Sequence, residues 1–170
     1  MSELFSIQLQ NRQQQGRDGV WLDLPTITEQ VQAALRQIGI SSDNPQGLFI
    51  SGYFAEEEKR FAIPYNMVLA SNVDELNFLA ARMETLSAGE RAELNAALQA
   101  PQSEFSSIGR ITDFPENVEY YVHLPDVRGP AQLGDYYLNR SGMVDMPEEW
   151  KGGIDTAQFG RYVAQQEQGV

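Results

Sequence analysis

The chain has 170 residues, and its 24 Asp and Glu against 12 Lys and Arg give a formal net charge of −12. It contains no Cys and a single His, which excludes disulfides, thiolate metal sites, cysteine nucleophiles and multi-His metal centres. Its longest apolar runs, of four residues, cannot span a bilayer, which needs roughly 20, and the absence of a signal-peptide pattern predicts a soluble cytoplasmic protein.

Residues 1–62 predict a small sheet with one helix packed on it. Alternating apolar residues predict strands over residues 4–9 and 20–24, and a polar turn separates them. The stretch Thr26–Glu29 has the form of a capping box, and apolar residues at helical spacing then predict a helix that Gly39 ends. A third strand is predicted at Leu48–Ile50, so we expect the order β-β-α-β for this first domain.

Helical signals dominate residues 63–103. The stretch Asn72–Glu75 resembles a helix cap, and an apolar stripe follows it as far as Leu86. Ser87–Glu90 is a further cap that precedes a second amphipathic stretch, which Pro101 closes. We expect a small helical domain here.

Residues 104–170 mix helix and strand signals. Residues 107–114 predict a short helix, and Val118–Leu124 alternates as a strand. Residues 130–141 predict a helix ended by Gly142, Pro147 starts one further turn, and the Gln-rich tail from Ala164 is expected to fray. We therefore expect a mixed α/β C-terminal domain, which makes the whole chain α+β.

No motif for catalysis or metal binding stands out. His123 could act as a general base beside Glu119, but without a nucleophile motif a half-buried strand histidine is the better interpretation. Glu56–Glu58 lacks the spaced ligands and the glycine of a calcium loop. The chain has no phosphate-binding loop, dinucleotide fingerprint or nucleophile elbow. We expect a protein that is not an enzyme and has no cofactor or metal, with a small hydrolase that uses His123 as the alternative.

The negative charge is spread along the chain. The net charge is −3 for residues 1–62, −3 for residues 63–103 and −6 for residues 104–170. Such charge disfavours contact with nucleic acids and anionic membranes, which are themselves negative, and it favours a basic partner. From composition alone, a charge that serves only solubility, with no partner behind it, is the preferred interpretation.

Three groups of short stretches follow one another along the chain in an order that is typical of a known protein family. The first is Gly19–Pro25 with the strand Phe49–Tyr53, and the second is Val73–Ala80. The third comprises Phe105–Ile108, Gly134–Leu138, Met146–Glu149 and the closing stretch Ile154–Arg161. In this order and spacing they resemble the ArdA antirestriction family over nearly the whole chain.

The resemblance implies an antirestriction protein that imitates double-stranded DNA and occupies the DNA-binding groove of type I restriction–modification enzymes. It implies an elongated chain of three small domains that forms a homodimer through the C-terminal one. It also implies a gene carried on mobile genetic elements such as plasmids and conjugative transposons. The partner would be the restriction enzyme, without direct contact to nucleic acid or membrane. The alternative is an acidic interaction module that antagonises another DNA-binding protein or regulator.

Two groups of residues are predicted to carry this function. The acidic surface that imitates DNA is predicted to comprise Asp74, Glu75, Glu84, Glu90, Glu93, Asp113, Glu116, Glu119, Asp126, Asp135, Asp145, Glu148, Glu149 and Asp155. The resemblance assigns a dimer and antirestriction motif to Met146, Pro147, Trp150, Ile154, Asp155, Phe159, Gly160 and Arg161. In the family, Tyr, Tyr and Asp are common where this chain has Gly153, Thr156 and Tyr162. Imitation of DNA further requires that Arg110, Arg128 and Arg140 are not interleaved with the acidic residues on one surface.

Overall fold

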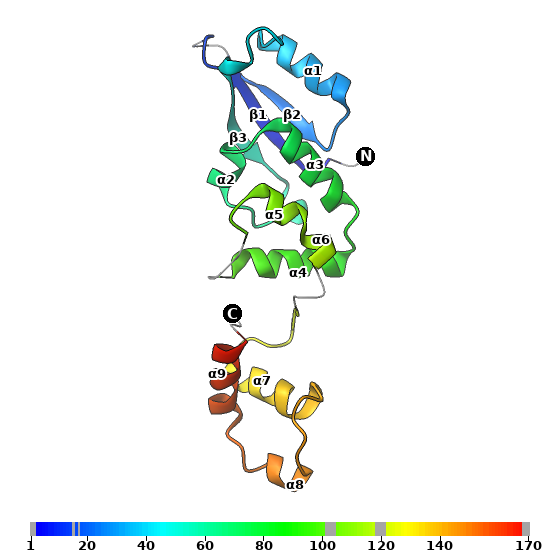
Figure 1. Cartoon of the computed structure of the whole chain (residues 1–170), viewed down its shortest axis with the longest axis vertical. Helices are drawn as coiled ribbons and strands as arrows, with labels where there is room; N and C mark the ends of the chain where they lie inside the picture. The colour runs from blue at the N-terminus through cyan, green and yellow to red at the C-terminus, as the bar shows by residue number, and fades with distance from the viewer. Residues whose placement is uncertain (1–2, 15, 17, 101–104, 118–121, 168–170) are drawn as a thin grey trace. The chain divides into compact units, whose positions relative to one another are not determined.

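The computed structural model describes residues 3–14, 16, 18–100, 105–117 and 122–167, which fall into two compact units (Figure 1). Unit 1 consists of Met1–Gln99 and Ser103–Tyr121, and unit 2 of Ala100–Gln102 and Val122–Val170. The described residues form one small sheet and a larger number of short helices, so the predicted α+β class is confirmed. No helix in these ranges is long and apolar enough to cross a membrane.

Unit 1 begins with a three-stranded antiparallel sheet of order β2-β1-β3. Its strands are β1 (Phe5–Asn11), β2 (Val20–Leu24) and β3 (Leu48–Phe54). All three were predicted, but β1 and β3 run further than the apolar pattern indicated. β3 extends past its apolar start because Gly52, Tyr53 and Phe54 still pair with β1, beyond a register irregularity that leaves Ser51 without a register partner on β1.

Helix α1 (Thr28–Gln37) follows the sheet's second strand and ends at Gly39, whose φ of +72° suits glycine. The predicted capping box is wrong: Ile27 is the N-cap, and no side chain caps the helix. The backbone of Thr26 is held from elsewhere in the chain. Its N–H donates to Asn77 Oδ1 at 2.7 Å, and its carbonyl accepts from Asn77 Nδ2 at 2.9 Å.

The central helices are α2 (Tyr65–Leu69), α3 (Val73–Glu84) and α4 (Ala88–Gln99). Both predicted caps are present. Asn72 Oδ1 accepts from the N–H of Glu75 at 2.9 Å, and the N–H of Ser87 donates to Glu90 Oε2 at 2.8 Å. Helices α1 and α3 both pack against β2, which couples the sheet to the helical segment (Figure 1).

Two short helices complete unit 1, namely α5 (Ile108–Thr112) and α6 (Phe114–Asn117), close to the helix predicted over 107–114. A single cluster of buried apolar side chains extends from Leu4 in the sheet to Phe114 in α6. Residues on both sides of the predicted boundary after residue 62 therefore share one core. The division of the chain into three domains stays a prediction.

The described part of unit 2 is helical and contains no strand. It comprises α7 (Pro130–Asp135), the π-helical turn η4 (Tyr136–Arg140), α8 (Glu148–Lys151) and α9 (Thr156–Gln166). The helix predicted over 130–141 and the turn starting at Pro147 are confirmed. The fraying predicted from Ala164 is wrong for residues 164–166, which belong to α9.

The predicted strand Val118–Leu124 is not borne out where it can be compared. Residues 118–121 lie outside the described ranges, and residues 122–124 have no regular secondary structure. Alternation alone does not make a strand, because the backbone also needs a neighbouring strand to pair with. The described residues of unit 2 offer none, and Pro125 follows directly.

Candidate functional site

The first turn of α3 carries two of the predicted acidic residues, Asp74 and Glu75, and both are exposed. Carboxylates in this position are favoured by the free N–H groups and the positive end of the helix dipole. Glu75 is also part of the cap, because its Oε2 accepts from Ser71 Oγ at 2.7 Å and from Asn72 Nδ2 at 3.4 Å. Asp74 has no hydrogen bond or ion pair with any described residue, so its whole carboxylate is available to a partner.

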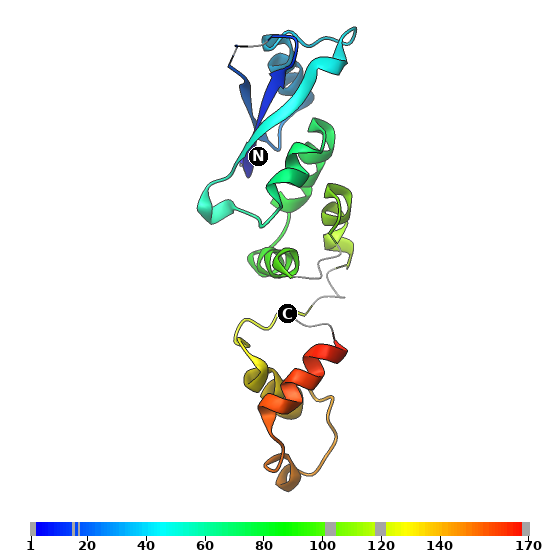
Figure 2. The same cartoon turned by 90° about the vertical axis from the view of Figure 1, so that its left-hand side faces the viewer.

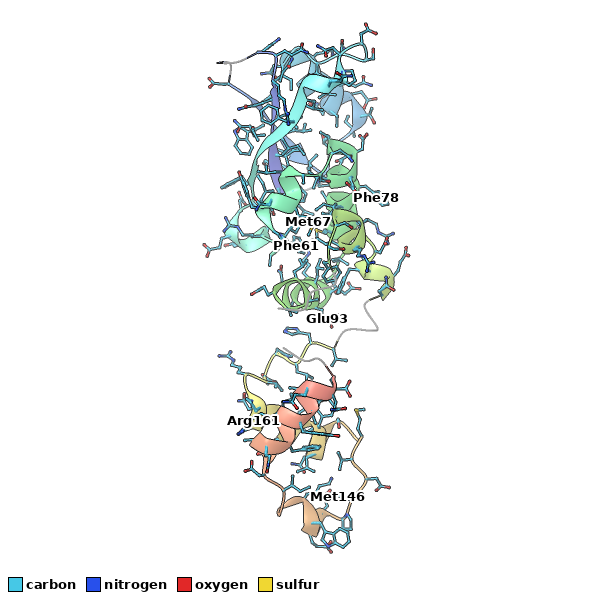
Figure 3. The ribbon with its side chains drawn as sticks, turned by 60° about the vertical axis from the view of Figure 1, so that its left-hand side comes forward. Phe61, Met67, Phe78, Glu93, Met146 and Arg161 are labelled. Atoms are coloured by element: carbon cyan, nitrogen blue, oxygen red, sulfur yellow. The ribbon has the colours of Figure 1, made fainter. Side chains whose placement is uncertain are left out.

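Glu84 on α3 and Glu90 on α4 are half-exposed. Glu93, also half-exposed on α4, is labelled in Figure 3. Hydrogen bonds from Ser87, first through its side chain and then through its backbone N–H, lower the pKa of Glu90 below its ordinary value of 4.5. This carboxylate is therefore held in its charged form. The cap and the negative surface charge come from the same side chain.

Around α5 and α6, basic and acidic side chains alternate. Asp113 and Glu116 are exposed, and Glu116 Oε1 lies 2.9 Å from Arg82 Nη2 of α3. Arg110 is exposed less than one turn before Asp113. Glu119 lies outside the described residues.

Unit 2 shows the same mixture. Asp135 lies 3.9 Å from Arg140 Nε, and Glu148 Oε1 lies 2.8 Å from Lys151 Nζ. Asp126 and Arg128 are both exposed and only two positions apart. Ion pairs with neighbouring cations reduce the field that these carboxylates present to a partner.

The remaining predicted carboxylates form no ion pair with any residue in the described ranges. They are Asp74, Glu75, Glu90, Glu93, Asp113, Asp126, Asp145, Glu149 and Asp155. They occur in both units, on helices and on the loops that precede helices. Each unit thus presents unpaired negative charge with a few cations placed among it.

The residues predicted as the dimer and antirestriction motif end in α9, which crosses α7 closely (Figure 2). A Cβ atom at Gly160 would collide with the carbonyl of Pro130, and one at Gly134 would collide with the carbonyl of Thr156. Gly160 therefore packs within its own chain, where only glycine lets the two backbones approach. Gly134 begins one of the stretches that carry the family resemblance, but it was not predicted as a site residue, although a glycine inside a helical pattern usually has a packing reason.

Other residues of the motif divide between packing and exposure. Asp155 caps α9, since its Oδ1 accepts from the N–H groups of Ala157 at 2.9 Å and Gln158 at 3.0 Å. Met146, Ile154 and Phe159 are half-buried, whereas Pro147, Trp150 and Arg161 are exposed (Figure 3).

Four apolar or aromatic side chains in the described part of unit 2 are largely exposed. They are Val122, Met143, Trp150 and Tyr162, which are 75%, 70%, 67% and 59% exposed. Met143 and Tyr162 were not predicted, because exposure cannot be read from residue type. Apolar side chains this exposed are available to a partner.

The structure brings no catalytic group to His123 within the described ranges. His123 is half-exposed in the segment before α7 and has no hydrogen bond there, while Glu119 and Tyr121 lie outside the described residues. In the same ranges, no three His, Cys, Asp or Glu side chains gather as a metal ion would require.

Comparison with known proteins identifies the family. No curated protein sequence matches the chain. The family described as "Antirestriction protein (ArdA)" matches residues 15–170, which is nearly the whole chain. The acidic surface and the Gly134–Gly160 crossing described above lie within these matched residues. The chain therefore belongs to the ArdA family of antirestriction proteins.

Proposed function

We propose that the protein acts as an antirestriction protein by imitating double-stranded DNA and occupying the DNA-binding groove of a type I restriction–modification enzyme. The observation that carries this proposal is the set of exposed carboxylates that form no ion pair among the described residues of either unit. Proteins that bind DNA line the binding site with Lys and Arg, which neutralise phosphates. A protein that presents carboxylates instead can occupy the same site.

Helical spacing suits this role. Carboxylates three or four positions apart on a helix lie about 5–6 Å apart, a separation of the same order as that between phosphates along one strand. Glu90 and Glu93 on α4 have this spacing. Both carboxylates are charged at neutral pH, and the lowered pKa of Glu90 extends its charged state to a lower pH than that of an ordinary glutamate.

The proposal includes assembly and location. Exposed Trp150 and Tyr162 on unit 2 support a homodimer formed through the C-terminal segment, since large exposed apolar side chains are favoured at protein contacts. The protein would act in the cytoplasm, where restriction enzymes meet incoming DNA, and would itself contact neither DNA nor membrane. The protein would act by binding alone, without an enzymatic step of its own.

Charge removal at chosen positions tests the proposal. We would neutralise four exposed carboxylates without described ion pairs, in the variant D113N/D126N/D145N/E149Q, and measure inhibition of a type I enzyme's cleavage and methylation. We expect the half-inhibitory concentration to rise about tenfold, which corresponds to roughly 0.35 kcal/mol for each charge.

The matched control is E29Q/D43N/E56Q/E57Q, which removes the same charge from exposed positions outside the predicted surface. We expect a change below about twofold for this control. Equal loss in both variants would contradict a defined surface and leave only a general charge effect. Wild-type protein that inhibits neither reaction, but binds another DNA-binding protein, would favour the alternative of an acidic antagonist of a regulator.

A further inference from the structure

The solvent-facing side of α3 carries a phenylalanine, Phe78, that is not buried in the core. Phe78 is 60% exposed, whereas Leu76, Leu79 and Met83 of the same helix are almost completely buried. In Figure 3, Phe78 lies on α3 away from the core residue Phe61 and from Met67, which packs against the core. A ring exposed to this extent gains little from the hydrophobic effect in the free protein, so it is available for a partner.

Acidic residues precede this ring on the same helix. Asp74 and Glu75 lie four and three positions before Phe78, which places them on the same face of α3 one turn away. Ala81, three positions later, is exposed and too small to cover the ring. Arg82, four positions later, pairs with Glu116 Oε1 of α6 at 2.9 Å, so Glu116 adds a carboxylate whose charge Arg82 partly compensates and whose second oxygen has no partner among the described residues.

We propose that this face, defined as Asp74, Glu75, Phe78 and Glu116 and called the Phe78 face, docks an arginine side chain of a basic protein surface. A planar guanidinium stacks on an aromatic ring and at the same time donates hydrogen bonds to carboxylates. Lysine offers a compact, strongly hydrated charge and fits such a site less well. The Arg82–Glu116 pair demonstrates that a guanidinium is already held at the edge of this face.

The chemistry of the face selects its occupant. Its carboxylates outnumber its single cation, Arg82, so phosphate groups of nucleic acids or membranes are repelled. If two copies of the chain paired symmetrically through their Phe78 faces, the carboxylates of the two copies would lie together and repel each other. An arginine-bearing protein surface is complementary in both charge and shape. The inference rests on the proposed function for the identity of that surface, which would be the DNA-binding groove of the restriction enzyme.

The preference for arginine is measurable without the restriction enzyme. We would titrate the full-length, isotope-labelled protein at low salt with a hexa-arginine peptide and a hexa-lysine peptide, and follow the ring signals of Phe78 by NMR. We expect the ring signals to shift with hexa-arginine, which should bind about two- to fivefold more tightly than hexa-lysine. F78L should abolish this preference, and F78Y should keep it. Both variants should fold, since the ring is 60% exposed.

Three outcomes would overturn the inference. They are equal affinity for the two peptides, unshifted Phe78 signals, or an arginine preference that survives in F78L.

Inhibition assays then separate this inference from the proposed function. If wild-type protein and F78L inhibit the restriction enzyme equally, the Phe78 face is not the contact, although the proposed function stands. If the arginine preference is present but wild-type protein does not inhibit, the Phe78 face is supported and the proposed function fails.

Discussion

Two glycines allow the helices α7 and α9 of unit 2 to cross with their backbones in contact. Gly134 faces the carbonyl of Thr156, and Gly160 faces the carbonyl of Pro130, so each helix contributes one glycine to the other. A glycine inside a helix costs about 1 kcal/mol relative to alanine. Here the close packing of α7 against α9 offsets that cost, because any side chain at these two positions would force the helices apart.

Substitution of the buried glycine should therefore damage unit 2. We expect G160A to lower the free energy of unfolding by about 2–3 kcal/mol or more, because backbone carbonyls cannot move aside as a flexible side chain could. Denaturant unfolding, with limited proteolysis to locate the damage, would measure this. The control is G152A, since a Cβ at Gly152 meets nothing within 4 Å and the residue has a φ of −62°. A G160A protein as stable as G152A would contradict the crossing.

The Ser87–Glu90 cap predicts a pH effect. Hydrogen bonds from Ser87 lower the pKa of Glu90 below 4.5, so the contribution to stability is complete above the unfolded pKa and is lost as the pH falls through the folded pKa. S87A should raise the pKa of Glu90 towards 4.5 by removing the hydrogen bond from the Ser87 side chain to the Glu90 carboxylate. A carboxyl titration by NMR would measure the shift, and S106A, at another exposed serine, is the control. An unchanged Glu90 pKa in S87A would contradict this assignment.

At the scale of elements, two of the three predicted helix caps form and one does not, and the reason lies in their hydrogen-bond partners. The patterns Asn72–Glu75 and Ser87–Glu90 form caps because a side chain of each pattern binds a free backbone N–H group of the same pattern. The pattern Thr26–Glu29 looks equivalent, but the Asn77 amide binds both backbone groups of Thr26. That contact joins residues 51 positions apart, and no local pattern contains it.

The strands and helix α9 also show that a local sequence pattern locates some elements and misses others. The apolar alternation located β1 and β2 because one face of each is buried, whereas in β3 Ser51 and Gly52 interrupt the apolar signal at a register irregularity and the pairing continues through Tyr53 and Phe54. Helix α9 was hidden by its many glutamines, although Asp155 as N-cap with Phe159 and Val163 at helical spacing would have indicated it. Residues 122–124 carry the alternation of a strand but have no pairing partner among the described residues of unit 2.

Asp155 combines a structural role with a predicted functional one, and two variants separate them. D155A should lower the free energy of unfolding by about 1 kcal/mol because two N–H groups of α9 lose their acceptor. D155N keeps an oxygen acceptor and should stay within a few tenths of a kcal/mol of wild type. If Asp155 also belongs to the acidic surface, D155N should weaken inhibition by up to about fivefold at low salt. D155N with full inhibition would leave Asp155 as a cap alone.

At the scale of the whole molecule, the position of the cations matters as much as the net charge of −12. Composition and the spread of acidic residues could be read from the sequence, and so could the family. The ion pairs Arg82–Glu116, Arg140–Asp135 and Lys151–Glu148 could not, because they depend on which side chains the fold brings within reach.

A cation among the exposed carboxylates should weaken the imitation of DNA, and its removal should strengthen it. Arg110 is exposed less than one turn from Asp113 and has no ion pair with a described residue. We expect R110Q to lower the half-inhibitory concentration by about two- to fivefold at low salt. R36Q, which removes an exposed arginine from α1, is the control and should have a smaller effect. Weaker inhibition by R110Q would mean that Arg110 contacts the partner directly.

The central claim is that carboxylates bind a groove made for phosphates, and its most direct test is the salt dependence of inhibition. Wild-type protein would be titrated into a type I enzyme's cleavage reaction at about 50 and 200 mM salt, with the enzyme's own DNA affinity measured at each. DNA binding weakens steeply with salt because counterions are released from the phosphates. The account predicts that the protein's dissociation constant rises at least about tenfold over this range. A dissociation constant that does not change with salt would contradict the electrostatic mechanism.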